Sequence, residues 1–320
     1  MELIKKKYND FVLEGPNIKD WKLGAIGDDD IFEKPNWLSY DISKQLQKNR
    51  NFDTWSCTVF STLKSLQYYF KAKYGLDFDF SENFTAVMSG VKYGTGNSYR
   101  NVLESIRKDG WLLEIEWPFL PMETKEEYFK PIPSSLKEKA KKHLLKWKVK
   151  WEDIGYWNVN HDEIKRYLKK SPVLLSGYAW KKNSKGIYFE SGEKANHAFL
   201  CVDFEGYYPI IDDSYIDGFE YKENPSNKEF IKKLDKNFRF WSAHRLIVEP
   251  LFEESLINKF INMLKKIVRD VHGGFWFIKD NKKQKIDTPI AILASIADEF
   301  GVRTLNDEDL TKTPDYNWFK

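Results

Sequence analysis

Asp53-Thr54-Trp55-Ser56-Cys57-Thr58-Val59-Phe60-Ser61 is the most informative stretch of this 320-residue sequence. Apolar residues follow at helical spacing and predict that a helix starts here; they are Val59, Phe60, Leu63, Leu66 and Phe70. Cys57 then lies in the first helical turn, where the positive end of the helix dipole stabilises a thiolate. This cysteine, one of two in the chain, is the candidate nucleophile.

Two residues far downstream supply the partners that a reactive thiolate needs. His197 lies about 140 residues after Cys57 in a strand-like stretch, and Asp213 follows beyond a predicted hairpin. A histidine shares the proton of the thiol, and a third group orients the imidazole by accepting its other N–H. The order Cys57, His197, Asp213 therefore predicts a catalytic triad. Asp212, which points the other way on a strand, is the alternative orienting residue.

Composition argues against several classes of protein. The 51 basic and 48 acidic residues are interspersed and leave a net charge of +3, so nucleic-acid binding is not expected. No apolar stretch approaches the roughly 18 residues of a membrane span, and the start Met1–Lys7 lacks the apolar segment of a signal peptide. Two cysteines do not make a disulfide framework, which favours a reducing, cytoplasmic location.

Neither a metal nor a cofactor is expected. The glycines of Gly94-Thr95-Gly96 lack the Lys-Ser/Thr ending of a phosphate loop. Asp28-Asp29-Asp30 is more typical of a solvated turn than of a calcium site. Cys201 lies in a strand-like run and is expected to be structural. Four other histidines show no metal-ligand spacing; they are His143, His161, His244 and His272.

The pattern along the chain predicts an α+β fold with three parts. Residues 1–50 read as an extended N-terminal arm, residues 51–250 as the main domain, and residues 251–320 as a small C-terminal α/β module. In the main domain helices come first and strands follow. Helices are expected over about Ser56–Lys73, Ser81–Met88, Tyr99–Lys108, Ser135–Trp147 and Asp162–Lys170, and strands over Val173–Leu175, Gly186–Phe189, His197–Phe204, Tyr208–Ile211 and Phe238–Val248. The module is expected to be helix–hairpin–helix, with helices from Phe252 to Val271 and from Thr288, and a turn at Asp280-Asn281.

Several separate blocks resemble papain-like cysteine peptidases. Cys57-Thr58-Val59-Phe60-Ser61 is similar to their Cys-Trp-Ala-Phe-Ser, and Asn196-His197-Ala198-Phe199-Leu200 to their Asn-His-Ala-Val segment. Tyr208–Tyr215 is similar to Tyr-x-x-Ile-Lys-Asn-Ser-Trp, with Asp213 at the asparagine. The blocks span about residues 20–250 and look most like peptidases encoded by bacteriophages and uncultured bacteria.

This resemblance implies a papain-like fold, in which a helical subdomain carries the cysteine and an antiparallel β subdomain carries the histidine. It also implies hydrolysis of a peptide or protein substrate through a Cys57 acyl-enzyme, without a cofactor. The family's oxyanion glutamine lies six residues before the cysteine, where this sequence has Asn51, and Gln47 is the alternative. The substrate cleft implied by the family falls on Gly94, Gly96, Asn97 and Asn196.

Two other functions stay open at this point. The same triad could carry out another acyl transfer, such as transglutamination, or act as a peptidoglycan amidase or endopeptidase. The fold could also serve as a catalytically silent structural or adaptor protein of a phage particle. Two interpretations of the aromatic-rich residues 251–320 also stay open: a packed mini-domain, or a surface that docks to a virion or cell-wall component. Packaging of the chain in a virion stays open as well.

Overall fold

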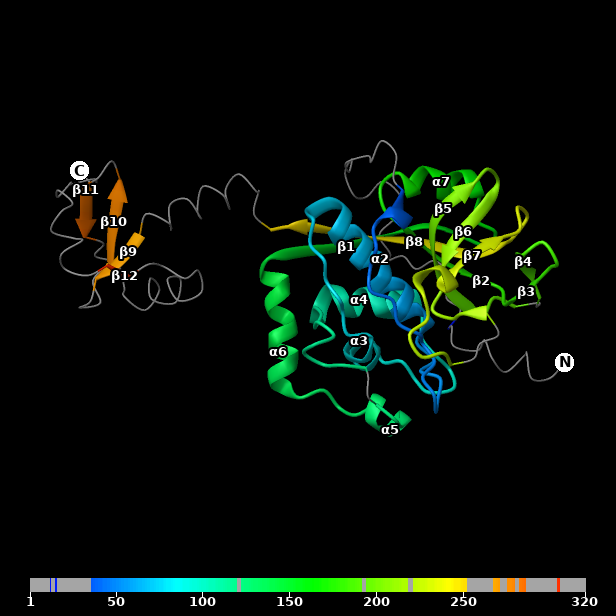
Figure 1. The fold of residues 1–320 in the computed structure, drawn as a ribbon, viewed down its shortest axis with the longest axis horizontal. Coiled ribbons are helices and arrows are strands. Elements are labelled where there is room, and N and C mark those ends of the chain that lie inside the picture. The colour runs from blue at the N-terminus through cyan, green and yellow to red at the C-terminus, as the bar shows by residue number, and fades with distance from the viewer. Residues whose placement is uncertain are drawn as a thin grey trace. The chain divides into compact units, whose positions relative to one another are not determined.

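The structure is a computed structural model that describes Val12, Gly15, residues 36–119, 122–191, 194–217 and 221–251, and four strands between 267 and 305. The chain divides into two compact units, Met1–Glu249 and Pro250–Lys320. Both units are drawn in Figure 1, and each is described separately.

The first half of the larger unit is helical (Figure 1). The helices are α2 (Cys57–Tyr74), α3 (Glu82–Ser89), α4 (Tyr99–Asp109), α5 (Lys125–Tyr128) and α6 (Ser134–Lys142), with short 3-10 turns η1 (Trp37–Ser39) and η2 (His143–Leu145). Their ends follow the capping residues: the Ser81 and Ser98 side chains accept N-terminal backbone N–H groups, and α2 ends at Gly75 with a left-handed φ of 66°. Almost all of α2 is buried, so it forms the centre of the core.

The second half forms one eight-stranded sheet. Its strands are β1 (Trp147–Tyr156), β2 (Val173–Gly177), β3 (Trp180–Lys182), β4 (Ile187–Glu190), β5 (His197–Glu205), β6 (Tyr208–Asp212), β7 (Ile231–Leu234) and β8 (Phe240–Pro250), joined by α7 (His161–Leu168) and η4 (Asn227–Phe230). The order is β1-β8-β2-β5-β6-β7-β4-β3. Pairing along β8, β2, β5, β6 and β7 is antiparallel, while β4 pairs with β7 in parallel. The prediction of an α+β fold is confirmed.

The helix predicted over Ser135–Trp147 is too long, and the strand that follows it was not predicted. The helix ends at Lys142, and Trp147 begins β1. The Trp147 ring packs on Phe70 of α2 at 4.9 Å between centroids, so a tertiary contact overrides the local helical preference. The short strands β3 and β7 were also missed, because each is too brief to show a period in the sequence.

The smaller unit contains a four-stranded sheet of order β11-β10-β9-β12. Its strands are β9 (Ile267–Asp270), β10 (Phe275–Lys279), β11 (Lys282–Lys285) and β12 (Thr304–Leu305). The hairpin predicted around Asp280-Asn281 is confirmed, since Lys279 pairs with Lys282. The end of the helix predicted over Phe252–Val271 is instead β9, whose β-branched Ile267 and Val268 pair with β10. The rest of that helix, and most of the helix predicted from Thr288, lie outside the described residues.

Candidate active site

Cys57 is the first residue of α2 and is fully buried. The chain enters the helix through Trp55, which has a left-handed φ of 57°, a conformation that is uncommon outside glycine. Ser56 precedes the thiol and lies 3.1 Å from the Tyr128 hydroxyl. The first N–H groups of a helix have no intrahelical partner, so this turn presents backbone donors and a positive dipole end beside the sulfur.

A chain of polar contacts ties the first turn of α2 to β5. Ser61 donates to the Cys57 carbonyl at 2.7 Å and lies 2.9 Å from the Tyr99 hydroxyl. The same hydroxyl donates to the Phe199 carbonyl at 3.1 Å, two residues beyond His197 on β5. Burial raises the pKa of Tyr99, and negative charge on Cys57 adds to this rise. Tyr99 therefore stays a neutral hydroxyl that fixes the cysteine helix against the histidine strand.

His197 and Asp213 form a direct, fully buried contact. His197 begins β5, and β5 pairs with β6 so that Leu200 lies opposite Asp212. This register brings the next residue, Asp213, back to the histidine, and Nε2 of His197 lies 2.7 Å from its Oδ1. The imidazole is surrounded by aromatic rings, with the Trp180 centroid at 5.1 Å and the Tyr215 centroid at 5.6 Å. These rings exclude water and fix the plane of the imidazole.

The Asp213 carboxylate is held by donors on both of its oxygens. Oδ1 also accepts the backbone N–H of Ser214 at 2.8 Å, and Oδ2 accepts from Nζ of Lys232 at 2.8 Å. Burial raises the pKa of Asp213, but the charges of Lys232 and His197 outweigh it and hold the pKa well below the usual range. The group that faces the imidazole is therefore a carboxylate, able to accept a hydrogen bond from Nε2–H.

The neighbouring Asp212 points into a different cluster. Its oxygens lie 2.7 Å from Nζ of both Lys44 and Lys64, and the Tyr68 hydroxyl donates to it at 2.9 Å. Burial raises its pKa, and the two lysines more than reverse the effect. Between the two aspartates, only Asp213 contacts the imidazole in the described residues.

Of the two predicted oxyanion residues, Gln47 contacts Ser214 and Tyr215, which follow Asp213, and Asn51 does not. The buried Gln47 amide donates to the Tyr215 hydroxyl at 2.8 Å and to Asp53 at 3.1 Å, and its oxygen accepts from Ser214. Asn51 is exposed and donates instead to the Glu123 carbonyl at 3.0 Å. Lys48 bridges to Asp53, so a turn separates Gln47 from Cys57. Counting six residues back from the cysteine leads to Asn51, which lies in this turn.

The predicted cleft residues fall in two places. Gly94 and Gly96 have left-handed φ values of 81° and 74° and form a tight loop before α4. The Asn97 side chain donates to the Ser89 carbonyl and closes this loop, and the backbone carbonyl of Asn97 accepts the backbone N–H of Val12 at 2.8 Å. The loop reaches the cysteine segment through a ring contact of Tyr93 with Trp55.

Asn196 lies directly before the histidine and acts on the backbone. Its side-chain oxygen accepts the Ala179 N–H, and its own N–H donates to the Gly177 carbonyl, both at 2.9 Å. These bonds hold the connection between β2 and β3 against the start of β5. Asn196 therefore helps to fix the position of His197 on the strand.

Sequence reasoning missed Lys232, which contacts Asp213 directly. Its sequence context is Ile231-Lys232-Lys233-Leu234, in which nothing local distinguishes the two adjacent lysines. Only the alternation of a strand could separate them, since Lys232 faces inward and Lys233 outward. In a short strand within a lysine-rich region, this alternation is too brief to be recognised in the sequence.

Three of the remaining polar candidates, Cys201, His161 and His244, have structural partners, while His272 and Asp28-Asp29-Asp30 lie outside the described residues. Burial raises the pKa of Cys201, which keeps it a thiol. His161 contacts the Phe238 carbonyl, and His244 lies 2.5 Å from Asp153. The described part of the chain holds no group of three His, Cys, Asp or Glu side chains suited to a metal ion. None of its helices combines the length and hydropathy needed to cross a membrane.

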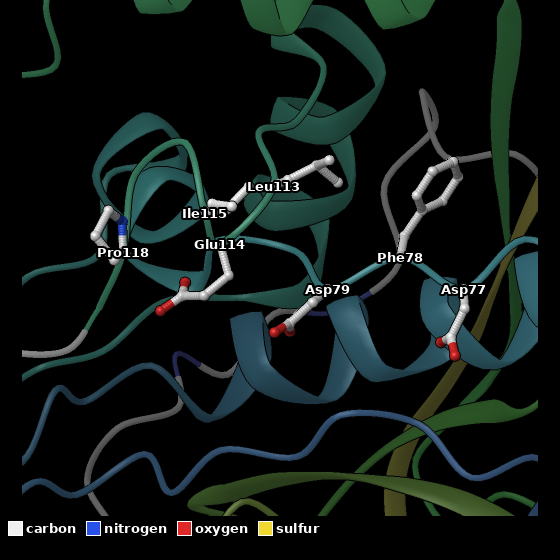
Figure 2. Close-up of a pocket in the computed structure, with 7 residues that line it drawn as sticks. All are labelled: Asp77, Phe78, Asp79, Leu113, Glu114, Ile115 and Pro118. Carbon is white, nitrogen blue, oxygen red and sulfur yellow. The ribbon is translucent and has the colours of Figure 1, made fainter.

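A separate hollow of about 390 Å³ lies on the helical side. Figure 2 shows its seven lining side chains: Asp77, Phe78, Asp79, Leu113, Glu114, Ile115 and Pro118. Cys57, His197 and Asp213 are not among these residues. Its three carboxylates already accept hydrogen bonds from within the protein, donated by Lys71, Gln67 and the Phe119 amide. We therefore assign it no chemistry.

No family model matches this sequence, and no curated protein matches it. Solved structures do match its fold. The protein is similar to xylellain, a cysteine protease from Xylella fastidiosa, with a TM-score of 0.52 and 17% identity over 74% of this chain and 96% of that one. It is also similar to the cysteine protease and lectin-like domains of Cwp84, a surface layer associated protein of Clostridium difficile, with a TM-score of 0.54 and 16% identity over 78% of this chain.

The chain spans little more than half, 58%, of the Cwp84 chain that it matches. At these identities the likeness concerns the fold. The larger unit has a papain-like α+β fold, as the sequence resemblance implied.

Proposed function

We propose that this protein is a cysteine peptidase that hydrolyses peptide bonds through a Cys57 acyl-enzyme. The observation that carries the proposal is the buried 2.7 Å contact between Nε2 of His197 and Oδ1 of Asp213. It occurs on a strand that packs against the helix beginning at Cys57. The likeness to two proteins described as cysteine proteases supports the proposal.

The contact with Asp213 assigns roles to the two ring nitrogens. Nε2 donates to the carboxylate, and Nδ1 takes the proton of the Cys57 thiol. The thiolate attacks the peptide carbonyl, and the imidazolium returns its proton to the leaving amine. Water, deprotonated by the same nitrogen, then hydrolyses the thioester and regenerates the thiol. The negatively charged oxygen of each tetrahedral intermediate is stabilised by the Cys57 N–H.

We propose that Gln47 supplies the side-chain donor to this oxygen. It is buried against Ser214 and Tyr215, which directly follow the orienting Asp213. Asn51 is exposed, and its amide is engaged elsewhere. An oxyanion bound beside Cys57 would take the place of one of the present acceptors of the Gln47 amide.

We propose that an extended peptide is the substrate and that its backbone pairs with the loop Gly94–Asn97. The Asn97 carbonyl already accepts a backbone N–H, that of Val12. This is the type of bond that a peptide in extended conformation makes with a cleft wall. Recognition through the backbone would leave side-chain preference to other residues.

The test is turnover of a fluorogenic peptide library by the wild type and three variants. Cys57→Ala and His197→Ala should lose activity, while Cys201→Ala should keep it. Full turnover by Cys57→Ala would contradict the proposal. Transfer of the acyl group to an added amine, or release of peptidoglycan fragments, would support the acyl transfer or cell-wall alternatives. A folded protein with an inert Cys57 would support the structural or adaptor alternative. Three further points stay predictions: the resemblance to peptidases encoded by bacteriophages, the cytoplasmic location, and a virion or cell-wall partner for residues 251–320.

A further inference from the structure

Lys232 is a buried lysine whose charge the proposed mechanism does not use. Its side chain is 1% exposed, and Nζ lies 2.8 Å from Oδ2 of Asp213. It also donates to the Tyr215 carbonyl and lies 5.8 Å from the centroid of the Trp180 ring. Burying an ammonium is costly unless a fixed anion compensates it. The position of Lys232 is therefore specified by Asp213 and by the wall of the imidazole pocket.

The two oxygens of Asp213 divide their partners between the histidine and the lysine. Oδ1 faces His197, whereas Oδ2 faces Lys232. A lone carboxylate beside an imidazole strongly favours the imidazolium. The ion pair of a carboxylate and an ammonium has no net charge. It therefore orients the ring through a hydrogen bond but stabilises the imidazolium much less than a lone carboxylate does.

We propose that Lys232 is a positioning residue that neutralises Asp213, so that the buried pair orients His197 as an uncharged acceptor would. This inference rests on the proposed function of the same site. Lys232 does not touch the reacting atoms and acts only through Asp213.

The other ionisable groups around the pair leave this arrangement unchanged. Lys64 donates to the Asp213 carbonyl at 2.5 Å but has its charge compensated by Asp212. Asp217 accepts from Tyr188 and from Lys182. The Tyr99 hydroxyl donates to the Phe199 carbonyl, and the Tyr215 hydroxyl donates to Asp53. The test removes the thiol of Cys57.

The experiment is an NMR titration of the His197 imidazole in a Cys57→Ala background, with the signal assigned by loss in His197→Gln. Lys232→Met leaves Asp213 uncompensated and should raise the titration midpoint by about one pH unit. Asp213→Asn leaves the lysine uncompensated and should lower it. The double variant Asp213→Asn with Lys232→Met contains neither charge and should return the midpoint to near its starting value.

The matched control is Lys233→Met, which removes the adjacent lysine of the same strand. Lys233 is paired with Glu205 at the surface, so the midpoint should not move. If either single variant fails to fold, the His197 titration midpoint of the folded double variant is compared with that of the Cys57→Ala protein, and this comparison decides the question. A folded double variant whose midpoint equals that of Asp213→Asn, or a folded Lys232→Met whose midpoint does not move, would overturn the inference.

Hydrolysis with Cys57 restored supplies the second readout. The double variant should recover activity, by about tenfold or more over either single variant. The alkaline limb of its pH–rate profile should lie near that of the wild type. A purely structural role would lower activity in proportion to folded protein and leave the limb in place. Because the imidazole titration needs no turnover, an inactive wild type would refute the proposed function and leave the titration arms to decide the role of Lys232.

Discussion

Asp212 and Asp213 are adjacent residues whose carboxylates lie in two different buried charge clusters. Asp212 binds Lys44 and Lys64, and Asp213 binds His197 and Lys232. Lys64 belongs to the cysteine helix and also donates to the Asp213 carbonyl. Side chains alternate along an extended chain, so the two carboxylates point to opposite sides. One joins the cluster that anchors α2, and the other joins the cluster that contacts the imidazole. Stability and chemistry can therefore be separated by substituting one aspartate or the other.

Substituting Asp212 should chiefly reduce stability. Asp212→Asn leaves two buried lysines without their anion, and breaking such a pair costs about 3–5 kcal/mol of unfolding free energy. The matched control is Asp77→Asn, which breaks a 2.7 Å pair with Lys71 at a carboxylate that is 63% exposed. Such pairs contribute below about 1 kcal/mol. Urea unfolding of both variants measures the difference, and equal losses would contradict the assignment.

Glu82 should make the protein less stable as the pH rises. Burial raises the pKa of Glu82 well above its usual value, and the charges of Glu114 and Asp79 add to the rise. The folded state keeps a proton that the unfolded chain loses above about pH 4.3, so unfolding free energy falls as pH rises from there through the folded-state pKa. Glu82→Gln should flatten this slope above about pH 4.3 and increase stability on the alkaline side of that pH.

Urea unfolding at several pH values measures the effect of Glu82→Gln. The control is Glu126→Gln, whose side chain is 73% exposed and should leave the slope unchanged. A Glu82→Gln protein with the wild-type slope would show that another group is responsible.

Two glycines at helix ends should differ in their tolerance of alanine. Gly75 has a φ of 66° with nothing within 4 Å of an added Cβ, whereas at Gly110, with a φ of 75°, the Cβ would collide with the Ala140 carbonyl. Gly75→Ala should cost about 1 kcal/mol, the penalty of a left-handed residue. Gly110→Ala adds a backbone clash and should cost about 3 kcal/mol or more. Thermal unfolding ranks the two variants, and a reversed order would refute the packing of α4 against α6.

Gln47 and Asn51 should differ in their effect on turnover. Gln47→Ala should lower kcat by about 100-fold, the typical effect of removing an oxyanion donor, with a smaller change in KM. Asn51→Ala removes an exposed amide bound to a distant carbonyl and should change kcat less than about twofold. Steady-state kinetics on one peptide substrate compare them. A large loss in Asn51→Ala alone would restore the assignment made by counting residues from the cysteine.

The two cysteines should react with alkylating agents at different pH values. Burial raises the pKa of Cys201 and keeps it protonated, so iodoacetamide should not modify it in the folded protein. Cys57 should be labelled below pH 7 in the wild type and much more slowly in His197→Ala, because the imidazole takes up its proton. Peptide mapping by mass spectrometry distinguishes the sites. Equal labelling of both thiols, independent of His197, would argue against an assembled pair.

Much of the local structure was predictable because its causes lie within a few residues. Helical spacing after Ser56 and the glycine at position 75 predicted α2, whose bounds are Cys57–Tyr74. The helices predicted over Ser81–Met88 and Tyr99–Lys108 correspond to α3 (Glu82–Ser89) and α4 (Tyr99–Asp109), whose first turns are capped by Ser81 and Ser98. The strand Trp147–Tyr156 was not predictable by this route, because its first residue is held by a ring of α2 that lies far away in the sequence.

By itself the sequence determined the α+β class and the helix that begins at Cys57, and it supplied the residues that we propose as nucleophile, base and orienting group. The tertiary structure alone placed Lys232 against Asp213, and Gln47 rather than Asn51 beside Ser214 and Tyr215. The physical reason is range: periodicity and capping act between near neighbours, whereas pairing of buried charges depends on which elements pack together.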